Sequence, residues 1–392
     1  MAAARFYMLD LSLIPASEYT PDTPAEAWHA RAVSAPAPFP RGSLAAMAPL
    51  AFFPVQLERV LGYSLYFALN FVPMVAVYGY AAAWALQLPW VRFALLCMGA
   101  YVIVLYAAYT MLCRACGWHK GQWSYQGPRD ARSARRNQYA IGERNTQIYH
   151  NMRFVWPAAL DPTPARESPP TLFCVVPHGV LPLGALAYPI FSKLFSSRLC
   201  RWTAAPVLFS LPIVGGLLGA IGSIPAKSEA ITKTLVEGSS DVGIILDGIA
   251  GMFEEMGPDM ETAHVLSRTG IIAIALKVGN VQIVPVYAFG HSQAWEILQD
   301  RFGLMRRLST WLNVSLVLFI GRWFWPFGPA RRLPVTLAFG EPLLVPSNPD
   351  PTAKPSPALV EEYHKKFVQG LVETFDTHKD SFGWGHKRLL LT

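Results

Sequence analysis

The stretch TLFCVVPHGV, residues 171–180, decides the fold expected of this chain. Its first six residues are apolar or β-branched, and their number suits a strand buried on both faces of a sheet. Pro177 ends such a strand because proline has no backbone N–H to donate. His178 and Gly179 follow, a titratable side chain and a residue that lets the backbone turn sharply or approach a ligand closely. The stretch predicts a central strand with a candidate site at its carboxyl end.

Further strands and helices alternate towards the carboxyl terminus. A second buried strand, DVGIIL, is broken at Asp247-Gly248. This alternation predicts an α/β fold with a mostly parallel sheet flanked by helices. Sites in such sheets gather beyond the carboxyl ends of strands, where His178 and Asp247 both lie. The predicted strands are 171–176, 241–246, 281–290 and 334–342, and the predicted helices are 228–238 (capped by Ser228), 267–278 (ending at Gly279) and the amphipathic 359–379.

Two uncharged segments precede this region. Residues 60–86 and 93–113 contain no charged side chain and are each long enough for a bilayer core, which takes roughly 20 helical residues. The short link between them, 87–92, predicts a transmembrane or re-entrant helical hairpin. Two buried core helices are the alternative, but fully apolar helices of this length are rare in soluble folds.

A basic stretch follows the hairpin and sets the expected orientation. Lys and Arg close to a membrane segment favour the cytosolic side, so the bulk of the chain is expected in the cytosol. We divide the chain into a disordered, Ala- and Pro-rich segment (1–50), the membrane hairpin (51–116), a basic membrane-surface linker (117–170) and an α/β domain (171–392). Residues 302–328 are unusually apolar, and a lipid-facing or acyl-lining role and plain core burial both remain open.

Composition limits the possible functions. The chain has 392 residues with 52% hydrophobic and 15% charged, which excludes a mostly disordered protein and argues against an ordinary soluble enzyme. The net charge of +7 suits anionic lipid surfaces or phosphate-bearing substrates, and no pattern suggests nucleic acid. Five scattered cysteines form no disulfide framework, and Cys113 and Cys116 lack a second pair, so no metal site is expected.

His178 is the best candidate for catalysis. A neutral imidazole can take a proton from an alcohol during attack on an acyl group, although a hydrogen-bonded core histidine is the plainer alternative. Serine-hydrolase, zinc-protease and nucleotide-binding motifs are all absent. A histidine with an acid five residues on occurs at His291 and Glu296, but on one helix these would lie about 140° apart. Lys227 and Arg268, near Gly270, are candidate phosphate contacts or simply solvated charges.

Several blocks together resemble the type-2 diacylglycerol acyltransferase family, which also contains monoacylglycerol and wax-alcohol acyltransferases. They follow the hairpin in the family's order. The blocks are FCVVPHGVLPLGALAY (173–188), SIPAKSEAITKTL (223–235), ILDGIAGMF (245–253), LSRTGIIAIALKVG (266–279), IVPVYAFG (283–290), GEPLLVP (340–346) and YHKKFVQGLVETFDTHKDSFG (363–383).

The resemblance implies roles for particular residues. His178, with Pro177 and Gly179 beside it, matches the second His of the family's His-Pro-His-Gly block and would deprotonate the acceptor hydroxyl. Arg268 and Gly270 match its Arg-x-Gly. We assign Pro177, His178, Gly179 and Asp247 to catalysis, and Lys227, Gly248, Arg268 and Gly270 to the acyl-CoA co-substrate.

Two departures from the family pattern stand out. The first His of the block is Val176 here. The family's Gly-Gly-x-x-Glu is Asp247-Gly248-Ile249-Ala250-Gly251, so glycine replaces its acid. Asp247, Glu254 or Glu255 are the candidates to substitute for that acid.

The resemblance implies a membrane-bound, acyl-CoA-dependent diacylglycerol O-acyltransferase that forms triacylglycerol without a further cofactor. Its expected partners are fatty acyl-CoA, diacylglycerol or another lipid alcohol, and the lipid bilayer, with a homo-oligomer possible. Its expected location is the endoplasmic reticulum membrane or lipid droplets. Monoacylglycerol or wax-alcohol acylation and a non-catalytic lipid-droplet or membrane scaffold are the alternatives.

Overall fold

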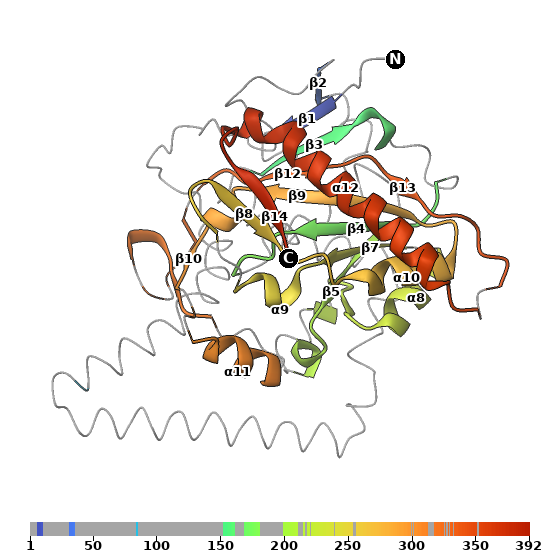
Figure 1. Ribbon diagram of the computed structural model, residues 1–392, viewed down its shortest axis with the longest axis horizontal. Helices are drawn as coiled ribbons and strands as arrows, with labels where there is room; N and C mark the ends of the chain where they lie inside the picture. Colours follow the sequence, from blue (N-terminus) through green and yellow to red (C-terminus); the bar gives the residue numbers. More distant parts are fainter. Residues whose placement is uncertain are drawn as a thin grey trace.

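The computed structural model describes a mixed α/β unit built on one large sheet (Figure 1). Helices pack against this sheet, as the sequence predicts. The residues described are 6–10, 31–35, 84, 152–160, 168–180, 199–210, 215, 218–219, 221–238, 240–253, 256–298, 300, 302–312, 317–324, 326, 328, 330–331, 333–350 and 353–392.

One half of the sheet is parallel and contains the candidate site. β4 (Thr171–Val176) is buried along its whole length, because strands flank it on both sides and apolar side chains pack on both faces of the sheet. It lies between β9 (Gln282–Phe289) and β7 (Ser240–Ile245), and pairs in parallel with both. β5 (Leu199–Ala204) and β6 (Ile224–Pro225) extend this half in the order β9-β4-β7-β5-β6.

The other half of the sheet is mixed, so the prediction of a mostly parallel sheet holds only around β4. β12 (Thr336–Phe339) pairs antiparallel with β9 and parallel with β3 (Arg153–Pro157). β1 (Phe6–Asp10) continues antiparallel to β3, and β2 (Val33–Ala35) lies antiparallel to β1 at the edge. The small strand β13 (Leu343–Leu344) also pairs antiparallel with β9.

Strands β1, β2 and β3 correct the predicted boundaries. Residues 6–10 and 33–35 are strands of the main sheet, although we interpreted 1–50 as disordered. Residues 153–157 belong to the sheet too, although we placed them in the linker. Tyr7 stacks on Trp156, and the Arg153 Nε donates to Asp10 Oδ2 at 2.7 Å with both side chains over 90% buried. The α/β unit therefore includes segments before residue 171.

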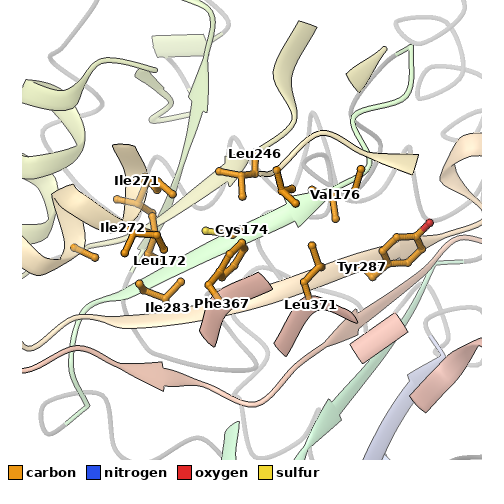
Figure 2. Close-up of a cluster of buried hydrophobic side chains, with 14 of the residues drawn as sticks. Leu172, Cys174, Val176, Leu246, Ile271, Ile272, Ile283, Tyr287, Phe367 and Leu371 are labelled. Carbon is orange, nitrogen blue, oxygen red and sulfur yellow. The ribbon is translucent and has the colours of Figure 1, made fainter. Parts of the chain in front are cut away.

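Three helices cover one face of the sheet. α8 (Ser228–Glu237), α10 (Thr269–Val278) and α12 (Pro357–Phe382) share an apolar cluster with β4 and β9 (Figure 2). The predicted apolar stripe of the last helix packs there, since Phe367, Leu371 and Phe375 are buried. α10 ends at Gly279 as predicted, but Lys227, not Ser228, occupies the cap of α8 and makes no side-chain cap bond.

Short elements complete the described part of the chain. They are η3 (Ala158–Leu160), η5 (Pro206–Ser210), α9 (Gly248–Gly251), β8 (Met260–Ala263), η6 (His291–Gln293), β10 (Glu296–Ile297), α11 (Leu304–Leu312), β11 (Phe319–Ile320), η7 (Arg322–Phe324) and β14 (Arg388–Leu391).

The predicted membrane hairpin lies outside the described residues, apart from Trp84. Among the helices that the structure does describe, none combines the length and apolar character needed to cross a bilayer.

We expect Asp10→Ala to lower the free energy of unfolding by about 3–5 kcal/mol, because it leaves the buried Arg153 guanidinium without its carboxylate partner. Thermal and denaturant unfolding of the purified protein measure this. The matched control is Glu237→Ala, which removes an ion pair with Lys233 whose side chains are more than half exposed and which we expect to cost below about 1 kcal/mol. Equal losses of unfolding free energy in the two variants would contradict the claim that the Asp10–Arg153 ion pair holds β1 to β3.

Candidate active site

His178 and Asp247 lie side by side at the carboxyl ends of two neighbouring strands. β4 and β7 run in parallel with Val175 opposite Ile245, so the residues just beyond both strands meet at one edge of the sheet. The backbone N–H of His178 donates to Asp247 Oδ2 at 2.9 Å. Both residues thus lie beyond the carboxyl ends of strands, as the sequence predicts, and the structure brings them into direct contact.

The imidazole of His178 is held in one tautomer by its own neighbour. Nδ1 lies 2.7 Å from the Gly179 carbonyl oxygen. A carbonyl only accepts, so Nδ1 carries the proton and the lone pair is on Nε2. Burial lowers the pKa of His178 below its ordinary value, although the residue as a whole is only partly buried. A neutral imidazole with an available lone pair can act as a base.

His291 also lies at the candidate site, a place that the sequence analysis, which weighs it only as a partner of Glu296, does not predict. Its Nδ1 donates to the Pro177 carbonyl at 2.9 Å, and its side chain is 1% exposed. The ring packs against Gly179, whose φ of +60° favours glycine and where an added Cβ would lie only 3.1 Å from the imidazole Nε2. His291 follows β9 as His178 follows β4, so the strand-end rule that found His178 could also have found it.

Asp247 is a buried carboxyl whose protonation is finely balanced. Burial raises its pKa to about 7, opposed by the hydrogen bond from His178 and the charge of Arg268. Oδ1 is buried without a hydrogen bond of normal geometry in the described part of the chain. Arg268 Nη2 donates to the Asp247 carbonyl at 3.0 Å and lies beside Gly248.

Gly251, which stands where the family has its acid, lies against Asp247. Gly251 is one helical turn after Asp247, and its N–H donates to the Asp247 carbonyl at 3.2 Å. A Cβ on Gly251 would overlap the Asp247 carboxyl group. A carboxyl group at position 247 therefore excludes a side chain at position 251. Within the Gly-Gly-x-x-Glu block, Asp247 replaces the family's first glycine and Gly251 replaces its glutamate, so the carboxyl group has in effect moved from one position to the other.

The replacement of the family's first histidine by Val176 lies within the core. Val176, which replaces the family's first His, is fully buried in the cluster beneath the helices. An imidazole there would lose its water, so an apolar side chain suits the site.

A cavity of about 1170 Å³ begins beside Gly179 and His291. Gly251 also lines it, so the cavity reaches the exchanged position. Its apolar wall includes Val180, Met252, Phe253, Trp295 and Leu298. Glu296 lines the cavity too but pairs with Arg331 at 2.6 Å, while His291 Nδ1 bonds the Pro177 carbonyl, which agrees with the sequence argument against a His291–Glu296 dyad.

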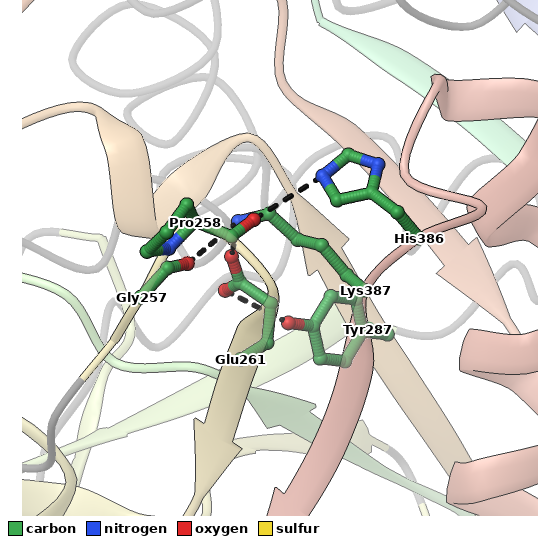
Figure 3. Close-up of polar contacts among 6 residues, drawn as sticks. All are labelled: Gly257, Pro258, Glu261, Tyr287, His386 and Lys387. Atoms are coloured by element: carbon green, nitrogen blue, oxygen red, sulfur yellow. Dashed lines mark hydrogen bonds and ion pairs between the residues drawn. The ribbon is translucent and has the colours of Figure 1, made fainter.

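The far wall of the cavity contains a buried charge pair (Figure 3). Lys387 Nζ and Glu261 Oε1 are 2.5 Å apart, with side chains 7% and 1% exposed. Tyr287 donates its hydroxyl to Glu261 Oε2 at 3.2 Å, and burial together with Glu261 raises its pKa. These contacts attach the carboxyl-terminal strand β14 to β8, and Trp384, His386 and Lys387 just before β14 form part of the cavity wall.

The predicted phosphate contacts are not all in one place. Arg268 and Gly248 lie against Asp247. Lys227 is exposed before α8, and Gly270 is exposed in the first turn of α10. Both helices are followed by strands parallel to β4, so their amino termini face the same edge of the sheet as His178.

A neutral histidine at the carboxyl edge of an α/β sheet, beside a large and partly apolar cavity, is an arrangement suited to an enzyme that activates a hydroxyl group of an apolar substrate. The chain belongs to the diacylglycerol acyltransferase family, whose model matches residues 104–392. The resemblance and the enzyme class predicted from the sequence are thus confirmed.

Individual relatives agree with this assignment. The chain is 25% identical to 2-acylglycerol O-acyltransferase 1 of Bos taurus over 313 residues, covering 76% of this chain and 90% of that protein. It is 26% identical to diacylglycerol O-acyltransferase 2 of Xenopus tropicalis, covering 63% and 72%. The 28% match to diacylglycerol O-acyltransferase 2-like protein 6 of Mus musculus covers 53% of this chain and 65% of that protein. No solved structure matches the chain.

We expect Gly251→Ala to destabilise the protein by about 1–3 kcal/mol, because the new methyl group forces the Asp247 carboxyl away from the His178 N–H. Thermal unfolding measures the effect. Gly270→Ala is the matched control, since a Cβ there meets nothing within 4 Å and alanine favours a helix. A Gly251→Ala protein as stable as the control would contradict the close contact.

Proposed function

We propose that this protein is a membrane-bound, acyl-CoA-dependent O-acyltransferase that esterifies diacylglycerol to triacylglycerol, with His178 as the general base. The Nδ1-protonated tautomer of His178, which leaves the lone pair on Nε2 and lies next to Gly179 of the cavity wall, is the observation that carries the proposal. The family membership and the names of the relatives support the reaction class.

The reaction needs two proton transfers, one from the acceptor hydroxyl to His178 and one from His178 to the leaving group. Nε2 takes the proton of the acceptor hydroxyl as its oxygen attacks the thioester carbonyl, which gives a tetrahedral oxyanion. The carbon–sulfur bond then breaks, and the imidazolium returns the proton to the leaving CoA thiolate. No covalent enzyme intermediate is required, because a thioester is already activated.

Backbone N–H groups stabilise the oxyanion in this scheme. Gly179 and Gly248 both adopt positive φ, +60° and +55°, and lie next to His178 and Asp247 respectively. Donors held in place before the reaction need no reorganisation when charge develops, and loss of one such donor typically costs about 10²–10³ in rate.

The co-substrates divide between the cavity and the sheet edge. The apolar wall of the cavity takes the acyl chain or the lipid acceptor, away from water that would hydrolyse the thioester. Arg268, Gly248, Gly270 and Lys227 bind the CoA phosphates, aided by the amino termini of α8 and α10, where free N–H groups and the helix dipole favour anions.

The membrane supplies the lipid substrates in this proposal. Residues 60–113 anchor the protein in the endoplasmic reticulum membrane as a hairpin, and the α/β domain acts on the cytosolic side or at lipid droplets. The uncharged length of both segments and the basic stretch that follows support this orientation.

We expect His178→Ala to lower acyl transfer by at least about 10²-fold, because it removes the base. Incorporation of labelled acyl-CoA into triacylglycerol by purified protein measures the loss. His264→Ala, a histidine outside the cavity lining, is the control and should retain activity. Undiminished synthesis by His178→Ala would refute the assignment of the base.

Monoacylglycerol is the second candidate acceptor. The match to the cattle 2-acylglycerol O-acyltransferase 1, which extends over 90% of that protein, favours it. A panel of diacylglycerol, monoacylglycerol and long-chain alcohols, each offered with the same acyl-CoA, separates these acceptors. No ester product with any of them would indicate a non-catalytic scaffold relative and would overturn the proposal.

The pKa of Asp247 makes stability depend on pH. Its folded-state value of about 7 exceeds the ordinary 3.8, so the carboxyl ionises more readily in the unfolded chain. The native protein therefore loses stability as pH rises from about 4 to about 7. Asp247→Asn keeps an oxygen acceptor for the His178 N–H without the charge, and should lose less stability over this range. Parallel pH profiles of the two unfolding midpoints would contradict the buried position of the carboxyl.

A further inference from the structure

Exposed apolar side chains are concentrated in one short region of the described chain. Of the twelve large hydrophobic residues that are exposed there, seven lie between positions 298 and 324. They are Leu298, Phe302, Leu304, Leu308, Trp311, Leu318 and Phe324. Exposed apolar side chains concentrated in so short a segment point to an interaction surface rather than to the scattered exposure of an ordinary surface.

Helix α11 presents its apolar side outwards. Leu304, Leu308 and Trp311 are 66%, 38% and 77% exposed, and at about 100° per residue they lie within an arc of about 60°. Ser309 lies about 140° from Leu304 and is fully buried. This is the reverse of a helix that packs its apolar face on a protein core.

The charge and length of α11 suit a lipid surface. Arg306 and Arg307 are exposed, and the helix LMRRLSTWL has no acidic residue. A helix of 9 residues is about 14 Å long, too short for a bilayer core of about 30 Å, so it would lie in the plane of the interface. Trp and Phe at such a helix suit the headgroup region.

The helix lies next to the candidate site. α11 contacts α9, the short helix that contains Gly248 and Gly251, and both appear at the same side of the sheet (Figure 1). Leu298 belongs to the exposed apolar group and also lines the cavity. A membrane under α11 would thus be close to the cavity that begins at His291.

We propose that the apolar face of α11, together with Phe302, enters the headgroup layer of an anionic bilayer and seats the cavity on the lipid surface. Leu304, Leu308 and Trp311 point towards the acyl chains, and Arg307, about 70° from the middle of their arc, meets anionic headgroups. The contact is separate from the predicted hairpin, which acts as the anchor in the proposed function.

Photo-crosslinking of the full-length protein in liposomes tests the contact directly. Trp311→benzoylphenylalanine should form lipid adducts, more of them with phosphatidylserine in phosphatidylcholine vesicles than with phosphatidylcholine alone. The matched control is Val236→benzoylphenylalanine, 63% exposed on α8, which should give none. Adducts of position 311 with protein, whether this chain or a second copy, or lipid adducts equal to those at 236, would overturn the proposal.

A kinetic experiment, which rests on the proposed function, tests the consequence. The variant Leu304→Ser/Leu308→Ser/Trp311→Ser should raise the apparent KM for diacylglycerol in vesicles by about tenfold or more, since apolar contacts with lipid are lost. The KM for a water-soluble short-chain acceptor should not change. Val236→Ser/Leu344→Ser, which removes exposed apolar side chains elsewhere, is the control. An unchanged KM in vesicles would overturn the seating, whereas a parent protein with no activity would refute only the proposed function, because crosslinking does not depend on turnover.

Discussion

The hydrogen bond from the His178 backbone to the Asp247 carboxyl joins the ends of two neighbouring parallel strands. It holds the backbone just where the chain leaves β4, and the Gly179 carbonyl then fixes the imidazole tautomer. His291 supports the same turn from β9 through the Pro177 carbonyl. Three adjacent strand ends therefore determine where one nitrogen lone pair lies, and no single residue could position it alone.

Burial controls the charge of this cluster. It lowers the pKa of His178 and raises that of Asp247, so both groups are driven towards their neutral forms. A neutral imidazole is the form that accepts a proton, which agrees with the proposed chemistry. Arg268 and the backbone N–H groups offset part of the cost of the buried carboxyl. Gly251 provides the space for that carboxyl, which explains in physical terms why glycine replaces the family acid.

Local sequence patterns predict the central strands of the sheet, but they do not predict contacts between residues that lie far apart in the sequence. The apolar run at 171–176 is strand β4 as predicted, because a fully buried strand leaves a plain signature. The pairing of β1 with β3 joins residues 143 positions apart, and the Glu261–Lys387 pair spans 126 positions, so no local pattern reveals either. The spacing of His291 and Glu296 says little about their place in the fold, whereas the position of His291 just beyond β9 is the informative feature. The clash between positions 247 and 251 appears only once α9 is built.

The exchange of carboxyl position can be tested directly by reversing it. Asp247→Gly removes the carboxyl and Gly251→Glu introduces one that overlaps it, so each single variant should lose acyl transfer. Asp247→Gly/Gly251→Glu restores the family's Gly-Gly-x-x-Glu arrangement and frees the space that a side chain at 251 needs. Acyltransferase activity of the four proteins is the measurement. We predict that the double variant recovers activity that both single variants lose, and a double variant no better than the worse single variant would contradict the account.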